Sequence, residues 1–87
     1  MMTYRVQVRV MPRTGLLDPQ GQAVEQALSA LGFAEAGGVR IGRAIQLEVA
    51  APSRADAETR ARQMCDKLLA NPVIESYRFD IEELVSA

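Results

Sequence analysis

The chain has 87 residues, of which 48% are apolar and 24% are charged, and its formal net charge is -1. This length suits one domain with one core, and the composition is ordinary for a folded domain, which excludes a disordered chain. A chain so close to neutrality also lacks the basic footprint that nucleic-acid-binding proteins use to neutralise phosphates.

The single cysteine, Cys65, has no partner for an intrachain disulfide and is compatible with a reducing compartment. No apolar run approaches the length that spans a bilayer. Residues 1–10 alternate polar and apolar side chains, unlike the continuous apolar segment of a signal peptide. We therefore expect a cytoplasmic protein that binds neither membrane nor nucleic acid.

The N-terminal segment has the period of a strand. Apolar residues occupy every second position from Tyr4 to Val10, which predicts a strand with one buried face. Between Pro19 and Leu31 the apolar residues recur at helical spacing, which predicts a helix. Gly32 predicts the C-terminal end of that helix.

Two short apolar runs follow the paired glycines at 37 and 38. Val39 and Ile41 predict a short strand, and the alternation from Ile45 to Val49 predicts another. Gly42 and Arg43 separate the two runs. We therefore expect a tight hairpin or a bulged pair here.

The C-terminal half predicts a second helix and a last strand. Ser53 is a natural N-cap with Asp56 three residues later, as in a capping box. The apolar stripe of the helix contains Cys65, which we expect in the core. Asn71 and Pro72 end the helix, because proline disfavours a helical residue before it. Alternation from residue 73 to residue 81 predicts the last strand.

The predicted order is β-α-β-β-α-β in a single domain over residues 1–87. This order is typical of a ferredoxin-like α+β fold, in which two helices cover one face of an antiparallel sheet. The uncovered face would carry charges of both signs that could pair across strands or meet a partner, or simply face solvent, at Arg5, Gln7, Arg9, Gln46, Glu48, Arg78, Asp80 and Glu82.

The sequence offers little catalytic chemistry. It contains no histidine, which removes the commonest general base and the commonest zinc ligand together. Cys65 falls on an apolar helix face, where a thiol is a poor nucleophile. The glycines at 37, 38 and 42 match no phosphate-binding loop, and hairpin geometry explains them better. We therefore expect no catalytic residue, cofactor site or metal site in this chain.

The segment LLDPQG at residues 16–21 joins the first strand to the first helix. Asp18 and Pro19 form a good helix start, because the carboxylate can accept a backbone N–H and proline suits the first helical position. Gln20 and Gly21 are not explained in this way, since glycine in a helix costs up to about 1 kcal/mol relative to alanine. We expect Gly21 to let another backbone approach closely at a subunit contact, with Gln20 as its polar neighbour.

The chain resembles the PurS family, the small subunit of phosphoribosylformylglycinamidine (FGAM) synthase in purine biosynthesis. The similarity runs in order through nearly the whole chain, and its two most specific blocks are LDPQG and KLLANPVIE. It differs at Arg43, where the family often has lysine. The matching residues are 15–21 (GLLDPQG), 23–24, 28–33, 39–43 (VRIGR), 65, 67–75 (KLLANPVIE) and 77–79.

The resemblance implies a subunit of a glutamine-hydrolysing, ATP-dependent C–N ligase that amidates formylglycinamide ribonucleotide (FGAR). In that family a large synthetase subunit holds ATP, magnesium and the nucleotide, and a glutaminase subunit releases ammonia. The small subunit is non-catalytic and bridges the other two, as a homodimer or tetramer. The interface candidates are Gln20, Gly21, Arg43, Asn71 and Pro72.

An alternative from another class is a small-molecule-sensing regulatory domain, which shares the β-α-β-β-α-β order and binds its ligand where two chains meet. Such modules usually sit beside an enzyme or regulatory domain in the same chain, and this sequence shows no second domain.

Overall fold

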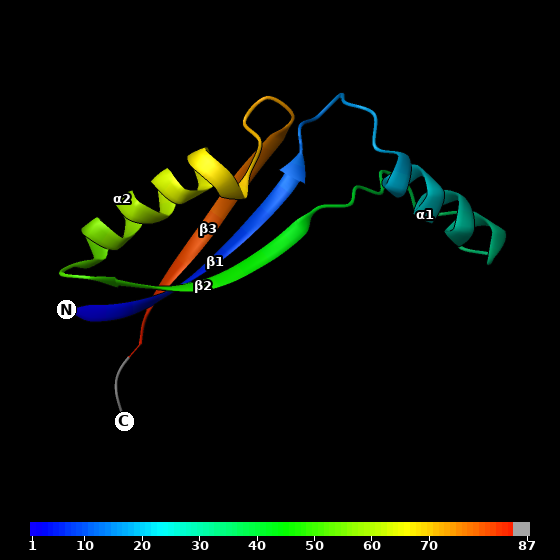
Figure 1. Ribbon diagram of the computed structural model, residues 1–87. Coiled ribbons are helices and arrows are strands. Elements are labelled where there is room, and N and C mark those ends of the chain that lie inside the picture. Colours follow the sequence, from blue (N-terminus) through cyan, green and yellow to red (C-terminus); the bar gives the residue numbers. More distant parts are fainter. Residues whose placement is uncertain (85–87) are drawn as a thin grey trace.

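The computed structural model of the chain describes residues 1–84. Three antiparallel strands form one sheet in the order β2-β1-β3, and the helix α2 lies across one face of it (Figure 1). None of the helices within these residues is long and apolar enough to cross a membrane. The elements are β1 (Met2–Pro12), α1 (Pro19–Ala30), β2 (Arg43–Ala51), α2 (Arg54–Met64), a π-helical turn (Cys65–Leu69) and β3 (Glu75–Leu84).

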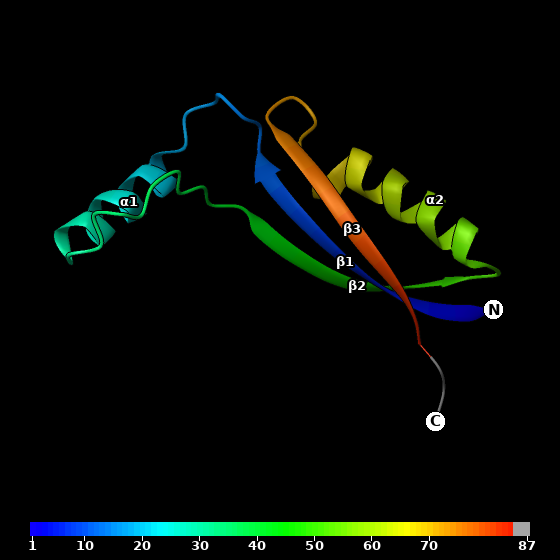
Figure 2. The ribbon, with the colours of Figure 1, turned by 180° about the vertical axis from the view of Figure 1, so that it is seen from behind.

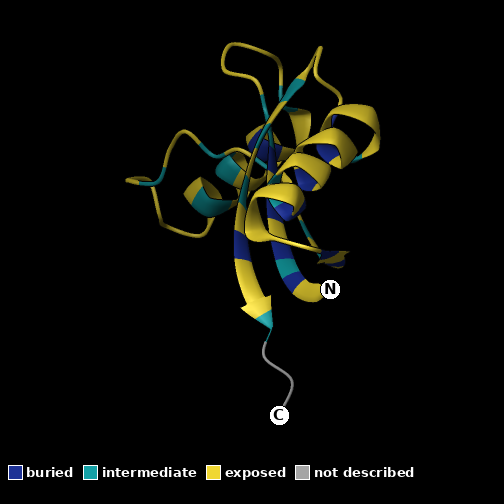
Figure 3. Ribbon diagram, turned by 90° about the vertical axis from the view of Figure 1, so that its left-hand side faces the viewer, coloured by how far each residue is buried: buried dark blue, intermediate teal, exposed yellow. Residues whose placement is uncertain are grey.

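The core lies between α2 and the central strand, β1. Val6, Val8 and Val10 are at most 1% exposed, because β2 and β3 flank them and α2 covers them. Buried residues concentrate in this layer (Figure 3). On the helix side the contact is made by small side chains, Ala57 and Ala61, which let α2 approach the sheet closely. The predicted strand at residues 4–10 and the α+β class are both confirmed.

The predicted start of α2 at Ser53 and the predicted end of α1 at Gly32 are both confirmed by hydrogen bonds and backbone geometry. The Ser53 hydroxyl accepts the backbone N–H of Asp56 at 3.2 Å and starts α2. Gly32 adopts a φ of 99°, its N–H donates to Ser29 and the N–H of Phe33 donates to Leu28. This pattern is a Schellman motif, whose left-handed residue is usually glycine.

The strand predicted at Val39 and Ile41 is wrong. Residues 37–42 form no ladder within the described part of the chain, and β2 begins only at Arg43. The Val39 N–H donates to the Glu25 carboxylate at 3.1 Å, and the Ile41 N–H donates to Asp18 at 2.8 Å. Carboxylates at the start and middle of α1 thus accept hydrogen bonds from alternate backbone N–H groups, which in a strand would donate to a neighbouring strand.

The expectation that both helices cover one face of the sheet is also wrong. We call residues 14–42 the arm; it carries α1 away from the sheet and from α2 (Figure 1). The radius of gyration is 16.9 Å, whereas a compact chain of this length has about 12 Å. With α1 displaced, α2 is the only helix over the sheet among residues 1–84.

Inside the arm, Gly21 lies against the returning chain. It is the only buried residue of α1, and a Cβ atom built on it would overlap the Val39 carbonyl oxygen and approach the Asp18 carboxylate at 2.7 Å. Glycine is needed here for close approach of two backbones within one chain.

We predict that Gly21→Ala destabilises the protein. Helix propensity alone would give a gain of up to about 1 kcal/mol, but the overlap with the Val39 carbonyl should produce a loss of about 1–3 kcal/mol. Urea unfolding measures the sign. Gly37→Ala is the matched control, because open space surrounds Gly37 and its φ is not in the left-handed region. A stabilised Gly21→Ala variant would contradict the close approach.

Candidate functional site

The structure gathers the candidate residues at two neighbouring places. The segment at 18–21 forms the start of α1, where the arm folds back on itself. Arg43, Asn71 and Pro72 lie at the other place, around residues 70–75, which we call the 70–75 loop. The two places are the root of the arm and the end of the sheet from which the arm projects (Figure 1).

At the root of the arm, Asp18 joins the two chain segments. One carboxylate oxygen accepts the Gly21 N–H at 3.0 Å and caps α1, and the other accepts the Ile41 N–H at 2.8 Å. These two bonds, the Gly21 bond above all, hold the pKa of Asp18 below its ordinary value. Pro19 occupies the first turn, as predicted, and Gln20 beside it is exposed.

The backbone that approaches Gly21 is that of Val39 in the same chain. The predicted close approach is therefore present, but it occurs inside the arm. A role of Gln20 or Gly21 at a subunit contact remains a prediction.

Asn71 and Pro72 lie in a hydrogen-bonded turn. The Asn71 side chain accepts the Val73 N–H at 3.1 Å, and the Asn71 N–H donates to Glu75 at 2.7 Å. The Pro72 carbonyl accepts two bonds from the guanidinium of Arg13, at 2.9 Å from Nε and 2.6 Å from Nη2. The backbone N–H of Arg13 donates to Ile74. Arg13, at the point where the chain leaves β1 and enters the arm, thus binds the ANPVIE segment.

Arg43 holds the same loop from the returning side of the arm. Its guanidinium donates to both oxygens of Glu75, at 2.6 and 3.0 Å, and to the Leu69 carbonyl at 2.7 Å. The hydrogen bond from Arg43 lowers the pKa of Glu75, with the Asn71 N–H as a second cause. The same contact raises the pKa of Arg43. The planar fork that makes this contact belongs to arginine and not to lysine.

Four residues of this site were not identified as candidates from the sequence: Arg13, Glu25, Gly42 and Glu75. Arg13 lies 59 positions from the carbonyl that it binds, and Arg43 lies 32 positions from Glu75. Gly42 is required because a Cβ atom there would overlap the Val10 carbonyl oxygen. Only the KLLANPVIE block signalled the loop.

A small cavity of about 230 Å³ opens between the π-helical turn and β3. Cys65 lines it, but burial raises the pKa of its thiol, with the charge of Asp66 as a second cause. Tyr77 donates its hydroxyl to Asp66 at 2.8 Å, and burial raises the pKa of Tyr77. The core position predicted for Cys65 is confirmed, and the thiol is not activated.

Apolar side chains remain exposed at both places. On the arm they include Leu17, Leu31 and Phe33, of which Leu17 is 74% exposed. At the 70–75 loop and just before it they include Val73, at 78%, and Leu68, at 82%. Val73 was predicted to belong to the last strand, but β3 begins at Glu75. Apolar groups gathered at the surface in this way mark sites of protein–protein contact.

We predict that Glu75→Gln lowers stability at neutral pH and flattens its acid dependence. Because the folded pKa of Glu75 is depressed, its contribution is present above the ordinary value of 4.5 and is lost as the pH falls through the lower folded value. Urea unfolding at several pH values between neutrality and pH 3 measures the difference. Glu35→Gln, on the exposed arm loop, is the control and should follow the wild type. Parallel curves for all three proteins would refute the Arg43–Glu75 contribution.

The chain matches the family model of PurS, described as phosphoribosylformylglycinamidine (FGAM) synthase, over residues 5–83. It is 43% identical over 83 residues to the phosphoribosylformylglycinamidine synthase subunit PurS of Bacillus subtilis, covering 95% of this chain and 98% of that one.

Solved structures agree with this match. A structure of B. subtilis PurS superposes with a TM-score of 0.80 and 44% identity, over 92% of this chain and 99% of that one. A chain of the PurLQS structure from Thermotoga maritima superposes with a TM-score of 0.84 and 31% identity, over 97% and 100%. The match therefore includes the arm as well as the sheet, and the chain belongs to the PurS family of FGAM synthase subunits.

Proposed function

We propose that this chain is the small subunit of an FGAM synthase and that it joins the synthetase subunit, PurL, to the glutaminase subunit, PurQ. The observation that carries the proposal is the end-to-end superposition on a chain of the PurLQS structure. In this proposal the ATP, magnesium and FGAR sites belong to the synthetase subunit, and glutamine is hydrolysed on the glutaminase subunit. The free Cys65 suits the cytoplasm, where we place the complex.

The side chains of the site support an assembling role. Asp18, Arg13, Arg43 and Glu75 have acid or base groups, but each is engaged in holding the arm or the 70–75 loop. The exposed residues Leu68, Asn71, Pro72 and Val73 belong to one short stretch of chain that includes the first half of that loop. We assign this stretch to contact with a larger subunit. Membership of the PurS family also displaces the alternative of a small-molecule-sensing domain.

We assign the arm to self-association. A helix of 12 residues such as α1 is marginal in water by itself. No other element of residues 1–84 covers α1, yet its exposed residues and those beside it include Leu17, Val24, Leu31 and Phe33. A second copy of the chain presents the same apolar surfaces in the same geometry, which a two-fold interface requires. A dimer or tetramer built through the arm follows.

We predict that the chain co-elutes with PurL and PurQ from the same source and switches on glutamine-dependent FGAM formation. Holding two active sites in one assembly raises the local ammonia concentration, so turnover should rise by roughly tenfold or more. Gel filtration and an FGAM assay measure the two effects. Ammonia in place of glutamine is the control, because that reaction does not need the glutaminase. No co-elution together with no change in rate would overturn the proposal.

We predict that the wild type sediments as a dimer or tetramer of the 9.5 kDa chain. The variant Leu31→Glu should shift this equilibrium toward the monomer. A buried interface position that gains a charge should raise the dissociation constant by roughly tenfold or more. Analytical ultracentrifugation over a concentration series gives the constant. Gln26→Glu, which adds the same charge at an exposed polar position of α1, is the matched control. A monomeric wild type would contradict the role of the arm.

A further inference from the structure

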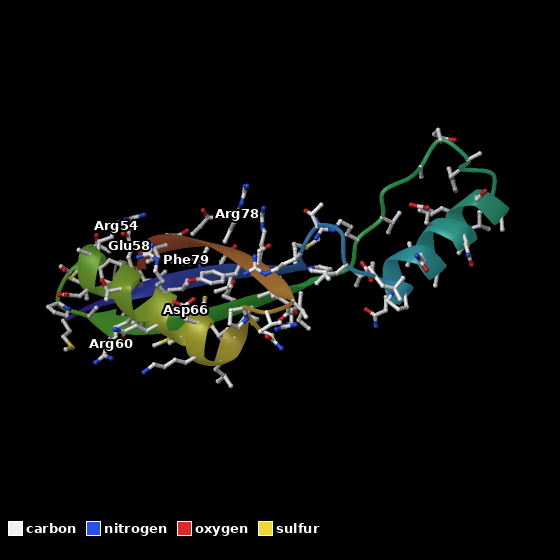
Figure 4. The ribbon with its side chains drawn as sticks, turned by 90° about the horizontal axis from the view of Figure 1, so that it is seen from above. Arg54, Glu58, Arg60, Asp66, Arg78 and Phe79 are labelled. Atoms are coloured by element: carbon white, nitrogen blue, oxygen red, sulfur yellow. The ribbon has the colours of Figure 1, made fainter. Side chains whose placement is uncertain are left out.

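Figure 2 shows the sheet face that α2 leaves uncovered, and the alternation along β1 and β3 places two arginines side by side on that face. Arg9 of β1 and Arg78 of β3 are direct partners in the antiparallel register, and both are exposed. Figure 4 shows Arg78 pointing away from the sheet on the side opposite α2. Like charges directly across two strands repel and destabilise the pair.

Arg40, from the returning segment of the arm, completes a cluster of three arginines. Together with Arg9 and Arg78 it lines a cavity of about 320 Å³ at the end of the sheet nearest the arm. The remaining lining comes from Met11, Ser76 and Tyr77, so no carboxylate lines the cavity. Met11 and Ser76 are themselves register partners, two residues along the strands from Arg9 and Arg78.

The other arginines of the sheet and arm have partners, which sets this cluster apart. Arg5, on the same face, lies opposite Glu82 in the register and 3.7 Å from it. Arg13 and Arg43 bind the 70–75 loop. Within residues 1–84, Arg9, Arg40 and Arg78 make no ion pair and donate no side-chain hydrogen bond.

Acids lie near the cluster but form no ion pair with it within residues 1–84, and two of them, Glu58 and Asp80, line a neighbouring cavity together with Arg78. Asp80 is two residues along β3 from Arg78 and opposite Gln7. Asp18 feels the charge of Arg40, but its oxygens accept backbone N–H groups at the root of the arm. Three positive charges thus converge from three separate segments on one concave site.

We propose that this cavity binds a small phosphorylated compound through its phosphate group. Guanidinium groups bind phosphate through two parallel hydrogen bonds, and the Ser76 hydroxyl adds a further donor at the same site. Met11 offers an apolar wall for the part of the ligand next to the phosphate. The volume is at the lower end of small-molecule sites, and its concave shape favours a compact ligand over an acidic segment of a partner protein.

This site is separate from the assembly role proposed above. The cluster shares no residue with the apolar surfaces of the arm or with the 70–75 loop. A failure of phosphate binding therefore leaves complex formation with PurL and PurQ untouched, and a failure of complex formation leaves the cavity untouched.

The test uses inorganic phosphate and ribose 5-phosphate as probes on the intact chain. NMR titration should move the resonances of Arg9, Arg40, Ser76 and Arg78 with a dissociation constant of about 1 mM for phosphate. Ribose 5-phosphate should bind more tightly if the Met11 wall contributes, and equally well if the phosphate group alone is bound. Both results support the proposal. Raising the ionic strength should weaken binding.

Three variants sharpen the test. Arg78→Ala should weaken phosphate binding by roughly tenfold or more, because one charge-assisted partner is lost. Arg78→Lys should lie between Arg78→Ala and the wild type, since it keeps the charge without the fork. Arg60→Ala, on the exposed side of α2, is the matched control and should bind as the wild type does.

Thermal unfolding gives a second and independent signature. In phosphate-free buffer Arg78→Ala should melt higher than the wild type, because the repulsion with Arg9 is relieved. Phosphate should raise the melting temperature of the wild type, and at the same concentration it should raise that of Arg78→Ala by less. The proposal fails if neither probe moves these resonances, or if Arg78→Ala binds phosphate as well as the wild type does. It also fails if Arg78→Ala loses PurL or PurQ while phosphate does not bind, because the arginines then face an acidic partner.

Discussion

The architecture depends on two arginines, one at each end of the arm, that donate hydrogen bonds to the segment around the 70–75 loop. Arg13 stands where the chain leaves β1, Arg43 stands where it enters β2, and both bind the segment that follows α2. These contacts hold both ends of the arm against the end of the sheet, and they join residues that lie 26 to 59 positions apart in the sequence. The loop in turn receives its shape from Asn71 and Glu75.

A sheet with one covering helix would ordinarily be a poor monomer, and we propose that the chain uses that arrangement for assembly. The strands and α2 supply a core of small residues sufficient to hold one face of the sheet. The arm contributes nothing to that core and instead presents apolar groups outward. The energy that a second helix would have gained on the sheet is thus available at contacts between chains.

Local patterns predicted much of this structure. The strand at residues 4–10, both helices, the caps at Asp18 and Ser53, the glycine stop at 32 and the buried Cys65 all follow from periodicity and short-range chemistry. The predictions were wrong where residues with a strand-like local pattern form hydrogen bonds with residues far away in the sequence. Val39 and Ile41 have strand-like spacing, but their N–H groups bind Glu25 and Asp18.

The candidate site shows the same division. Arg43, Asn71 and Pro72 could be selected through the family resemblance, whereas Arg13 and Glu75 are defined by contacts across tens of residues, which no spacing rule encodes. The position of α1 could not be derived from amphipathicity either. An apolar helix face shows that something covers the helix, but it does not tell whether the covering surface is the same chain or another.

The molecule measures 52 by 33 by 14 Å, whereas a compact sphere of similar mass would be about 30 Å across. On the assignments proposed above, this elongation would let the arm contact a second copy of the chain while the 70–75 loop contacts a larger subunit, without forcing those neighbours to collide. A rounder chain of the same length would have to place both contacts on a smaller surface and closer together. In this proposal the arm sets the distance between the second copy and the larger subunit, so a subunit with no reaction of its own can fix where its neighbours stand.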